Sequence, residues 1–151
     1  MVASPAQGEG KGAICADLGR ALAKAGKSTL ILDCDFRKGS VHELFGMHNA
    51  RGMVDVLAGT HRLQEVWEEP AKGLKVISTG PIPPDPEDLL DPRRLSQVIT
   101  SVREEEFDYI LVHSPSVESI SDPSLLLTDG GEVLLALAAQ NLLVLAAQKA
   151  C

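Results

Sequence analysis

The stretch from Ala3 to Gly12 constrains the fold of this chain more than any other. A short apolar lead, residues 1–3, runs into a loop that contains Gly8 and Gly10 and continues into Lys11. Apolar residues at helical spacing then predict a helix over 13–25, with a glycine at position 26 as its C-cap. A strand, a glycine-rich loop with a lysine and a helix together form a phosphate cradle, because loop amides, lysine and helix N-terminus all favour an anion.

Two positions depart from the usual pattern of such a phosphate-binding loop (P-loop), G-x-x-x-x-G-K-[ST]. Pro5 stands where the first glycine belongs, and Gly12 stands where a hydroxyl would hold Mg²⁺. The loop alone leaves two interpretations open. One is a phosphate site around Lys11, and the other is an ordinary glycine-rich turn between a strand and a helix.

Apolar runs and helical periodicities alternate along the chain. Strands are expected at 1–3, 28–33, 74–79, 107–113 and 132–138, and helices at 13–25, 41–45, 53–57, 63–67, 92–105 and 120–127. Asp91 is the expected N-cap of the helix that starts at Pro92, and a helix of at most three turns is expected over 141–150. Residues 80–86 carry four prolines and are expected to be a rigid loop, with a polyproline recognition segment as the less favoured interpretation. The alternation predicts one domain over 1–151 with a mostly parallel sheet flanked by helices. Together with the glycine-rich loop it indicates a three-layer P-loop NTPase-like α/β fold.

Two carboxylates mark the end of the second predicted strand. The apolar run over 28–33 leads into Asp33, Cys34, Asp35, Phe36 and Arg37. If the strand continues, the side chains at 33, 35 and 37 point the same way. The carboxyl ends of parallel strands are where open α/β sheets bind ligands, which favours a functional site. The alternative is a solvated strand end with a salt bridge.

Composition excludes several classes of function. The chain has 14 basic and 21 acidic residues and a net charge of −7, which argues against a nucleic-acid partner. No signal peptide is visible, and the apolar segment 133–147 is too short and too polar at its centre to span a membrane. The three cysteines have no metal-ligand spacing, so Cys15 and Cys34 are expected to be buried apolar residues and Cys151 a terminal thiol.

Several segments together resemble one family. They are Gly8–Lys11, Leu30–Lys38, His42–Gly46, Gly52–Gly59, Gly80–Leu90 and Phe107–Pro115. In this order they are similar to the cytoplasmic P-loop domain of bacterial tyrosine kinases, the autokinases of capsular and exopolysaccharide biosynthesis and export. That family lies within the deviant Walker A ATPases, which include septum-positioning and plasmid-partition proteins. Relative to the family, the domain over 1–151 is expected to be incomplete at both ends.

The resemblance implies an ATP-dependent protein-tyrosine kinase with ATP and Mg²⁺ as cofactors. It implies catalytic roles for Lys11, Asp33 and Asp35, with the two aspartates also binding Mg²⁺. The nucleotide-binding residues that it implies are Gly8, Glu9, Gly10, Lys11, Gly12 and Ala13. The implied partner is a membrane chain-length regulator of polysaccharide export, and the implied location is the cytoplasm, at the inner face of the membrane where that partner holds the chain. A homo-oligomer is left open.

The positions at which this chain differs from the family are those expected to bind Mg²⁺ or to accept the phosphoryl group. Gly12 replaces the hydroxyl that bonds Mg²⁺, and His113 stands where the family has its Walker B aspartate, although hard Mg²⁺ prefers oxygen ligands. The only tyrosine is Tyr109, in a predicted buried strand, where no acceptor is expected. We therefore expect an ATP-binding protein with weakened or lost catalysis. The alternatives are a non-catalytic interaction module of an export complex, and a partition-type ATPase, which the proline segment argues against.

Overall fold

The computed structural model describes residues 2–3, 10–85, 92–114, 132–139 and 142–149. The expected helix over 120–127, the expected cap Asp91 and the terminal Cys151 lie outside these residues. The elements in chain order are β1 (Val2–Ala3), α1 (Lys11–Lys24), β2 (Thr29–Asp33), α2 (Val41–Phe45), α3 (Met53–Leu57), α4 (Leu63–Val66), β3 (Glu68–Ala71), β4 (Leu74–Ile77), α5 (Pro92–Glu104), β5 (Tyr109–His113), β6 (Glu132–Ala139) and β7 (Leu142–Lys149).

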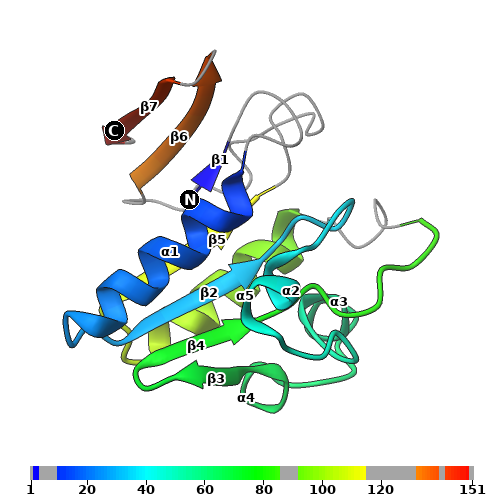
Figure 1. The fold of residues 1–151 in the computed structure, drawn as a ribbon. Helices are drawn as coiled ribbons and strands as arrows, with labels where there is room; N and C mark the ends of the chain where they lie inside the picture. Colours follow the sequence, from blue (N-terminus) through cyan, green and yellow to red (C-terminus); the bar gives the residue numbers. More distant parts are fainter. Residues whose placement is uncertain (1, 4–9, 86–91, 115–131, 140–141, 150–151) are drawn as a thin grey trace.

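The described strands form one sheet in the order β3-β4-β2-β5-β1-β6-β7 (Figure 1). The inner pairs β4–β2, β2–β5, β5–β1 and β1–β6 are parallel, and the pairs at the two edges, β3–β4 and β6–β7, are antiparallel. The prediction of a mostly parallel sheet flanked by helices is confirmed. Because β2 lies between β4 and β5, every one of its residues is buried.

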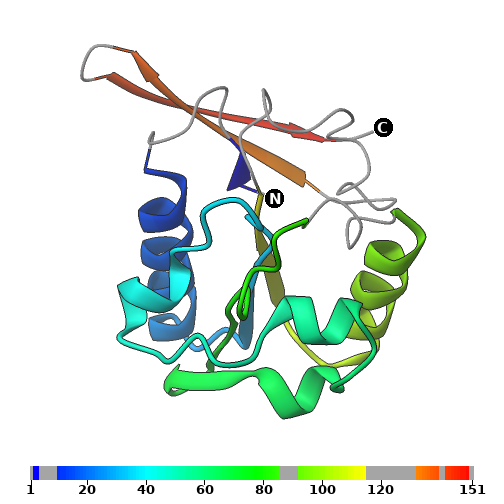
Figure 2. The same ribbon diagram turned by 90° about the vertical axis from the view of Figure 1, so that its right-hand side faces the viewer.

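Helices cover both faces of the sheet. Figure 2 views the sheet nearly edge-on, with α1 and α2 on one side and α3 and α5 on the other. The alternation along β2 divides the core accordingly, since Ile31 packs with Cys15 of α1 and Val41 of α2, while Leu30 and Leu32 belong to the opposite cluster. That second cluster also takes in apolar residues of α3, α4 and α5.

Two expectations for the edges of the sheet are wrong. The segment 141–150 was expected to be helical, but Leu142–Lys149 is strand β7, paired antiparallel with β6. Its leucines, alanines, glutamine and lysine suit a helix, and pairing with the neighbouring strand overrides that preference. Strand β3 was not expected at all, because Glu68–Ala71 has exposed residues throughout and a proline. Pairing with β4 creates it, at an edge where proline is tolerated.

The expected burial of Tyr109 is also wrong. The strand around it was predicted correctly, but Tyr109 is the first residue of β5 and is 45% exposed. Exposure falls along the strand until Leu111, Val112 and His113 are buried. A tyrosine at the amino end of a central strand can therefore reach solvent, although the strand reads as a continuous apolar run.

The start of α3 is joined to the end of β4. The amides of Met53 and Val54 donate to the carbonyl oxygens of Ser78 and Thr79, each at 2.8 Å. These bonds satisfy helix N–H groups that have no partner within α3. Such a close approach requires glycine at position 52, because a Cβ there would lie 2.1 Å from the Ser78 carbonyl oxygen.

We expect Gly52→Ala to destabilise the protein by about 3 kcal/mol or more, because the methyl group meets backbone that no rotamer change can move aside. Gly59→Ala is the matched control. Gly59 has a φ of +74° and open space around it, so only the left-handed backbone opposes alanine there, at a cost of about 1–2 kcal/mol. Urea unfolding of both variants tests this, and equal losses would contradict the close contact.

Candidate functional site

The helix that the sequence predicts after the glycine-rich segment is present as α1. Gly10 caps the helix with a φ of +77°, a left-handed conformation that glycine adopts without strain, and the helix begins at Lys11. A pocket of about 230 Å³ lies at this N-terminal end of α1, where the first amides lack partners within the helix. Its walls are formed by Gly10, Lys11, Gly12, Ala13, Asp35, Lys38, Ser40, Leu44 and His113.

Most of the residues predicted from the sequence for nucleotide binding therefore lie around one pocket. Gly8 and Glu9 fall outside the described residues. Lys11 is only 4% exposed, so its ammonium group belongs to the pocket rather than to the outer surface. A larger pocket of about 600 Å³ lies between α3, α4 and α5, but its lining contains neither Lys11 nor either aspartate. We therefore take the pocket at the start of α1 as the candidate site.

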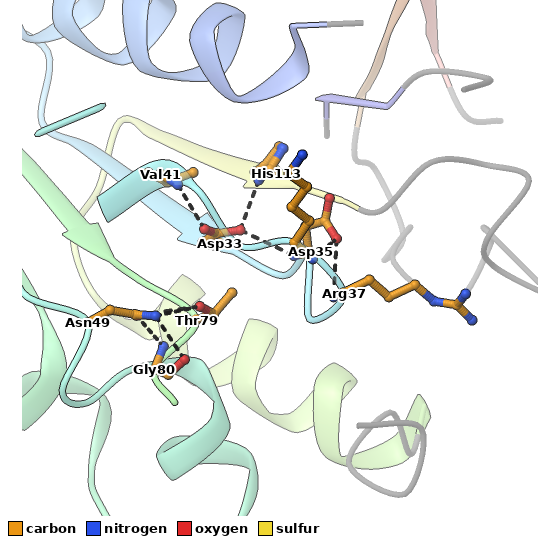
Figure 3. A network of polar contacts seen from close by, with 9 residues as sticks. Asp33, Asp35, Arg37, Val41, Asn49, Thr79, Gly80 and His113 are labelled. Atoms are coloured by element: carbon orange, nitrogen blue, oxygen red, sulfur yellow. Dashed lines mark hydrogen bonds and ion pairs between the residues drawn. The ribbon is translucent and has the colours of Figure 1, made fainter. Parts of the chain in front are cut away.

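Asp33 ends β2 and is fully buried. Its Oδ2 accepts a hydrogen bond from the Val41 amide at 3.1 Å. Its Oδ1 accepts one from the Asp35 amide at 3.2 Å and lies 2.8 Å from Nδ1 of His113 (Figure 3). Both oxygens are thus occupied by groups of the protein, and Asp33 is not among the residues that line the pocket.

Asp35 is placed differently from what strand alternation would give. The strand stops at Asp33, and the chain turns after Asp35, whose Oδ1 accepts hydrogen bonds from the amides of Arg37 and Lys38 at 3.3 and 3.1 Å. The carboxylate is held by this turn and contributes to the pocket wall, while Asp35 as a whole is only 5% exposed. Of the two aspartates, it is the one with access to a ligand in the pocket.

His113 ends β5 directly opposite Asp33, which is its register partner on β2. The residue is 2% exposed, its Nδ1 contacts Asp33, and it lines the pocket. The sequence placed His113 at the Mg²⁺ position but gave no sign of its contact with Asp33, which is 80 residues away along the chain.

The space beside Gly12 is filled by neighbouring side chains. A Cβ at Gly12 would lie 3.2 Å from Oγ of Ser40 and 3.4 Å from Cδ1 of Leu44. A hydroxyl from the start of α2 therefore lies close to where a serine at position 12 would project. Sequence reasoning missed Ser40, Lys38 and Leu44, although their position just after Asp35 was an available signal.

The residues fit a nucleotide better than they fit Mg²⁺. Lys11, Lys38 and the helix N-terminus suit phosphate oxygens. For Mg²⁺, which needs several oxygen ligands, Asp35 and the Ser40 hydroxyl are available in the pocket, whereas the Asp33 carboxylate is used internally. Within the described ranges, no three His, Cys, Asp or Glu side chains are grouped so that they could hold a metal ion.

Two buried cysteines, Cys15 and Cys34, lie near this pocket but do not line it. Burial, reinforced by the Asp33 carboxylate, raises the pKa of the Cys15 thiol to about 12. Burial and Asp33 likewise raise the pKa of Cys34 far above its usual value. Both thiols stay protonated at neutral pH, and the prediction that Cys15 and Cys34 are buried is confirmed.

The sheet order, and α1 with the pocket at its N-terminal end, are those of a P-loop domain of the α/β class. No protein-family model matches the chain. The putative tyrosine-protein kinase EpsB of Ralstonia solanacearum is 35% identical over 136 residues, which cover 89% of this chain and 18% of that relative. The kinase domain of the Escherichia coli tyrosine kinase ETK has 29% identity and a TM-score of 0.76, with 83% of this chain and 49% of that chain covered.

The chain is thus a homologue of the bacterial tyrosine-protein kinases and has the P-loop fold of their kinase domains. It spans less than a fifth of the length of EpsB. The septum site-determining protein MinD of Pyrococcus horikoshii, solved with Mg-ADP, shares the fold at a TM-score of 0.66 and 26% identity, with 76% of this chain and 47% of that chain covered. Among the described residues, no helix is long and apolar enough to cross a membrane.

Proposed function

We propose that this chain is an ATP-binding domain of the bacterial tyrosine autokinase family, acting in capsular or exopolysaccharide biosynthesis and export, with weakened or lost catalysis. The observation that supports it most is the pocket at the start of α1. There Gly10, Lys11, Gly12 and Ala13 meet Asp35 at the carboxyl side of the central strands. In our proposal Lys11 contacts the β- and γ-phosphates, and the backbone from Gly8 to Ala13 cradles them.

The proposed loss of catalysis rests on the hydrogen bonds that occupy the Asp33 carboxylate. In phosphoryl transfer, protein groups mainly position the reactants and neutralise charge, so each must be accurately placed. We assign Asp33 a positioning role, because its oxygens hold His113, Val41 and the turn at Asp35. Asp35 is then the carboxylate left for Mg²⁺ and for an incoming hydroxyl. A kinase site with one available carboxylate should turn over slowly.

The wider setting is proposed from the relatives. They include the putative tyrosine-protein kinase EpsB of Ralstonia solanacearum and a putative tyrosine-protein kinase in the cps region of Klebsiella pneumoniae. We propose a cytoplasmic location, at the inner face of the membrane through a chain-length regulator of polysaccharide export. The second candidate function is a non-catalytic interaction module of the export complex. We favour it over a partition ATPase, because the Asp33 carboxylate is occupied by hydrogen bonds within the protein.

Calorimetric titration with ATP and ADP, in EDTA and in Mg²⁺, tests the proposal. We expect both nucleotides to bind, and the ADP affinity to change by less than about threefold between the two conditions, because few oxygen ligands remain for the ion. Absence of nucleotide binding under all conditions would refute the function. A Mg²⁺-dependent gain of tenfold or more would instead refute the loss of the metal site.

A further inference from the structure

We propose that His113 makes this pocket a site for a nucleotide-bound transition-metal ion that accepts imidazole, of the Co²⁺, Ni²⁺ or Zn²⁺ class, in place of Mg²⁺. The proposal rests on the nucleotide binding proposed above. Its protein ligands are Nε2 of His113 and the carboxylate of Asp35, and phosphate oxygens and water complete the shell.

The hydrogen bonds of Asp33 fix the tautomer of His113. Two backbone amides donate to the Asp33 carboxylate, from Val41 to Oδ2 and from Asp35 to Oδ1, so it is an acceptor for its neighbours. The third contact, 2.8 Å from Oδ1 to Nδ1 of His113, therefore requires the proton on Nδ1. In a neutral imidazole with the proton on Nδ1, the lone pair lies on Nε2.

The ring that carries this lone pair lines the pocket. Its Cε1, the atom between Nδ1 and Nε2, lies 3.8 Å from where a Cβ on Gly12 would be. Among the described residues, Nε2 has no hydrogen-bond partner, whereas Nδ1 is firmly bonded.

An imidazole held by a carboxylate through its other nitrogen is the usual arrangement of a metal-binding histidine. The carboxylate fixes the orientation of the ring and makes the ligating nitrogen more basic. Asp33 supplies that support here, which gives its buried carboxylate a role that does not need direct contact with the ion. His61, a histidine outside the pocket, also lies beside an aspartate, with its Nδ1 3.8 Å from Oδ1 of Asp55, but both side chains are partly exposed.

The ligand set selects among ions. Mg²⁺ requires near-ideal octahedral oxygen coordination, whereas Co²⁺, Ni²⁺ and Zn²⁺ bind imidazole nitrogen well. The pocket offers one imidazole nitrogen, from His113, and one carboxylate, from Asp35, and the remaining ligands would be phosphate oxygens and water. A pocket that lost its affinity for Mg²⁺ would thereby have gained affinity for a softer ion.

Titration of ADP in the presence of EDTA, Mg²⁺ or Co²⁺ tests this in the wild-type protein. We expect ADP to bind at least tenfold more tightly with Co²⁺ than with Mg²⁺, and about equally with Mg²⁺ and with EDTA. Equal affinities with Co²⁺ and Mg²⁺ would overturn the metal site and leave nucleotide binding intact. No ADP binding in any condition would overturn both proposals.

His113→Asn is the sharpest variant, because the asparagine amide can still donate to Asp33 where Nδ1 did, while the Nε2 ligand is removed. We expect it to lose the Co²⁺ gain, so that it binds ADP no more tightly with Co²⁺ than with EDTA. His61→Asn is the control, since it changes a histidine beside an aspartate outside the pocket, and it should keep the gain. A Co²⁺ gain that survives His113→Asn would overturn the proposal.

Nitrogen-15 NMR of the histidine rings gives a test that needs no pocket variant to fold. We expect His113 in the metal-free protein to show a protonated Nδ1 and an unprotonated Nε2. Zn²⁺ with ADP should shift the Nε2 resonance, whereas Mg²⁺ with ADP should leave it in place. An Nε2 resonance that does not respond to Zn²⁺ and ADP would overturn the assignment.

Discussion

Lys11→Ala should weaken ATP binding at least tenfold. The Lys11 side chain is buried at the wall of the pocket, where its ammonium group is shielded from water and faces the site proposed for the phosphates. Charge-assisted hydrogen bonds of this kind contribute about 1.5–3 kcal/mol, and about 1.4 kcal/mol already corresponds to a tenfold change in affinity. Calorimetric titration of ATP into the variant and the parent, both in EDTA, measures the effect without the metal.

Lys24→Ala is the matched control for that experiment. Lys24 is the last residue of the same helix, exposed and at the opposite end from the pocket, so its loss removes the same charge without touching the site. ATP affinity should stay at the parental value. If Lys11→Ala also binds ATP as the parent does, the loop is a structural turn and not a phosphate cradle.

Asp33→Ala should lower the free energy of unfolding by about 3–5 kcal/mol, since each buried donor left without an acceptor costs about 1–3 kcal/mol. The carboxylate accepts hydrogen bonds from the Val41 amide, the Asp35 amide and the His113 ring. Alanine would leave all three donors buried without an acceptor, and each such group is costly in a protein interior. Urea unfolding of the variant and the parent gives the difference.

Asp17→Ala serves as the comparison for Asp33→Ala. Asp17 forms an ion pair with Arg20 at 3.1 Å on the exposed face of α1, where the pair is well solvated. Pairs of this kind contribute little, so the stability of this variant should match the parent. A stability of Asp33→Ala equal to that of Asp17→Ala would mean that water replaces the carboxylate, and that the network is not a support for His113.

The central part of the fold follows from patterns that the sequence shows directly. Residues 41–45 and 53–57 form helices with the bounds expected from their apolar spacing, and the apolar runs around β2 and β5 are buried parallel strands. The two edge strands of the sheet, β3 and β7, could not be predicted from such patterns. Strand β3 has no apolar alternation and exists through its pairing with β4, and β7 has helix-favouring residues that pair with β6. Tertiary pairing decides such segments, and a local pattern does not encode it.

In the candidate site, too, some residues could be predicted from the sequence and some contacts could not. Lys11, the glycines beside it and Asp35 could be brought together from the sequence, because a loop before a helix and the end of a parallel strand meet at one edge of the sheet. The contact between Asp33 and His113 could not, since it depends on the register of β2 against β5. Ser40 could have been suspected from its position just after Asp35, but its nearness to Gly12 comes from the packing of α2 on α1.

The exposure of Tyr109 sets the reaction order of any phosphoryl transfer to it. Tyr109 and His113 are the first and last residues of β5, and four steps along a strand cover about 13 Å. The tyrosine hydroxyl therefore lies at the far end of the sheet from the pocket that His113 lines, out of reach of a nucleotide bound in the same molecule. If this pocket did supply the phosphoryl group, transfer to Tyr109 would require two copies of the chain to meet, and its initial rate would rise with the square of the protein concentration.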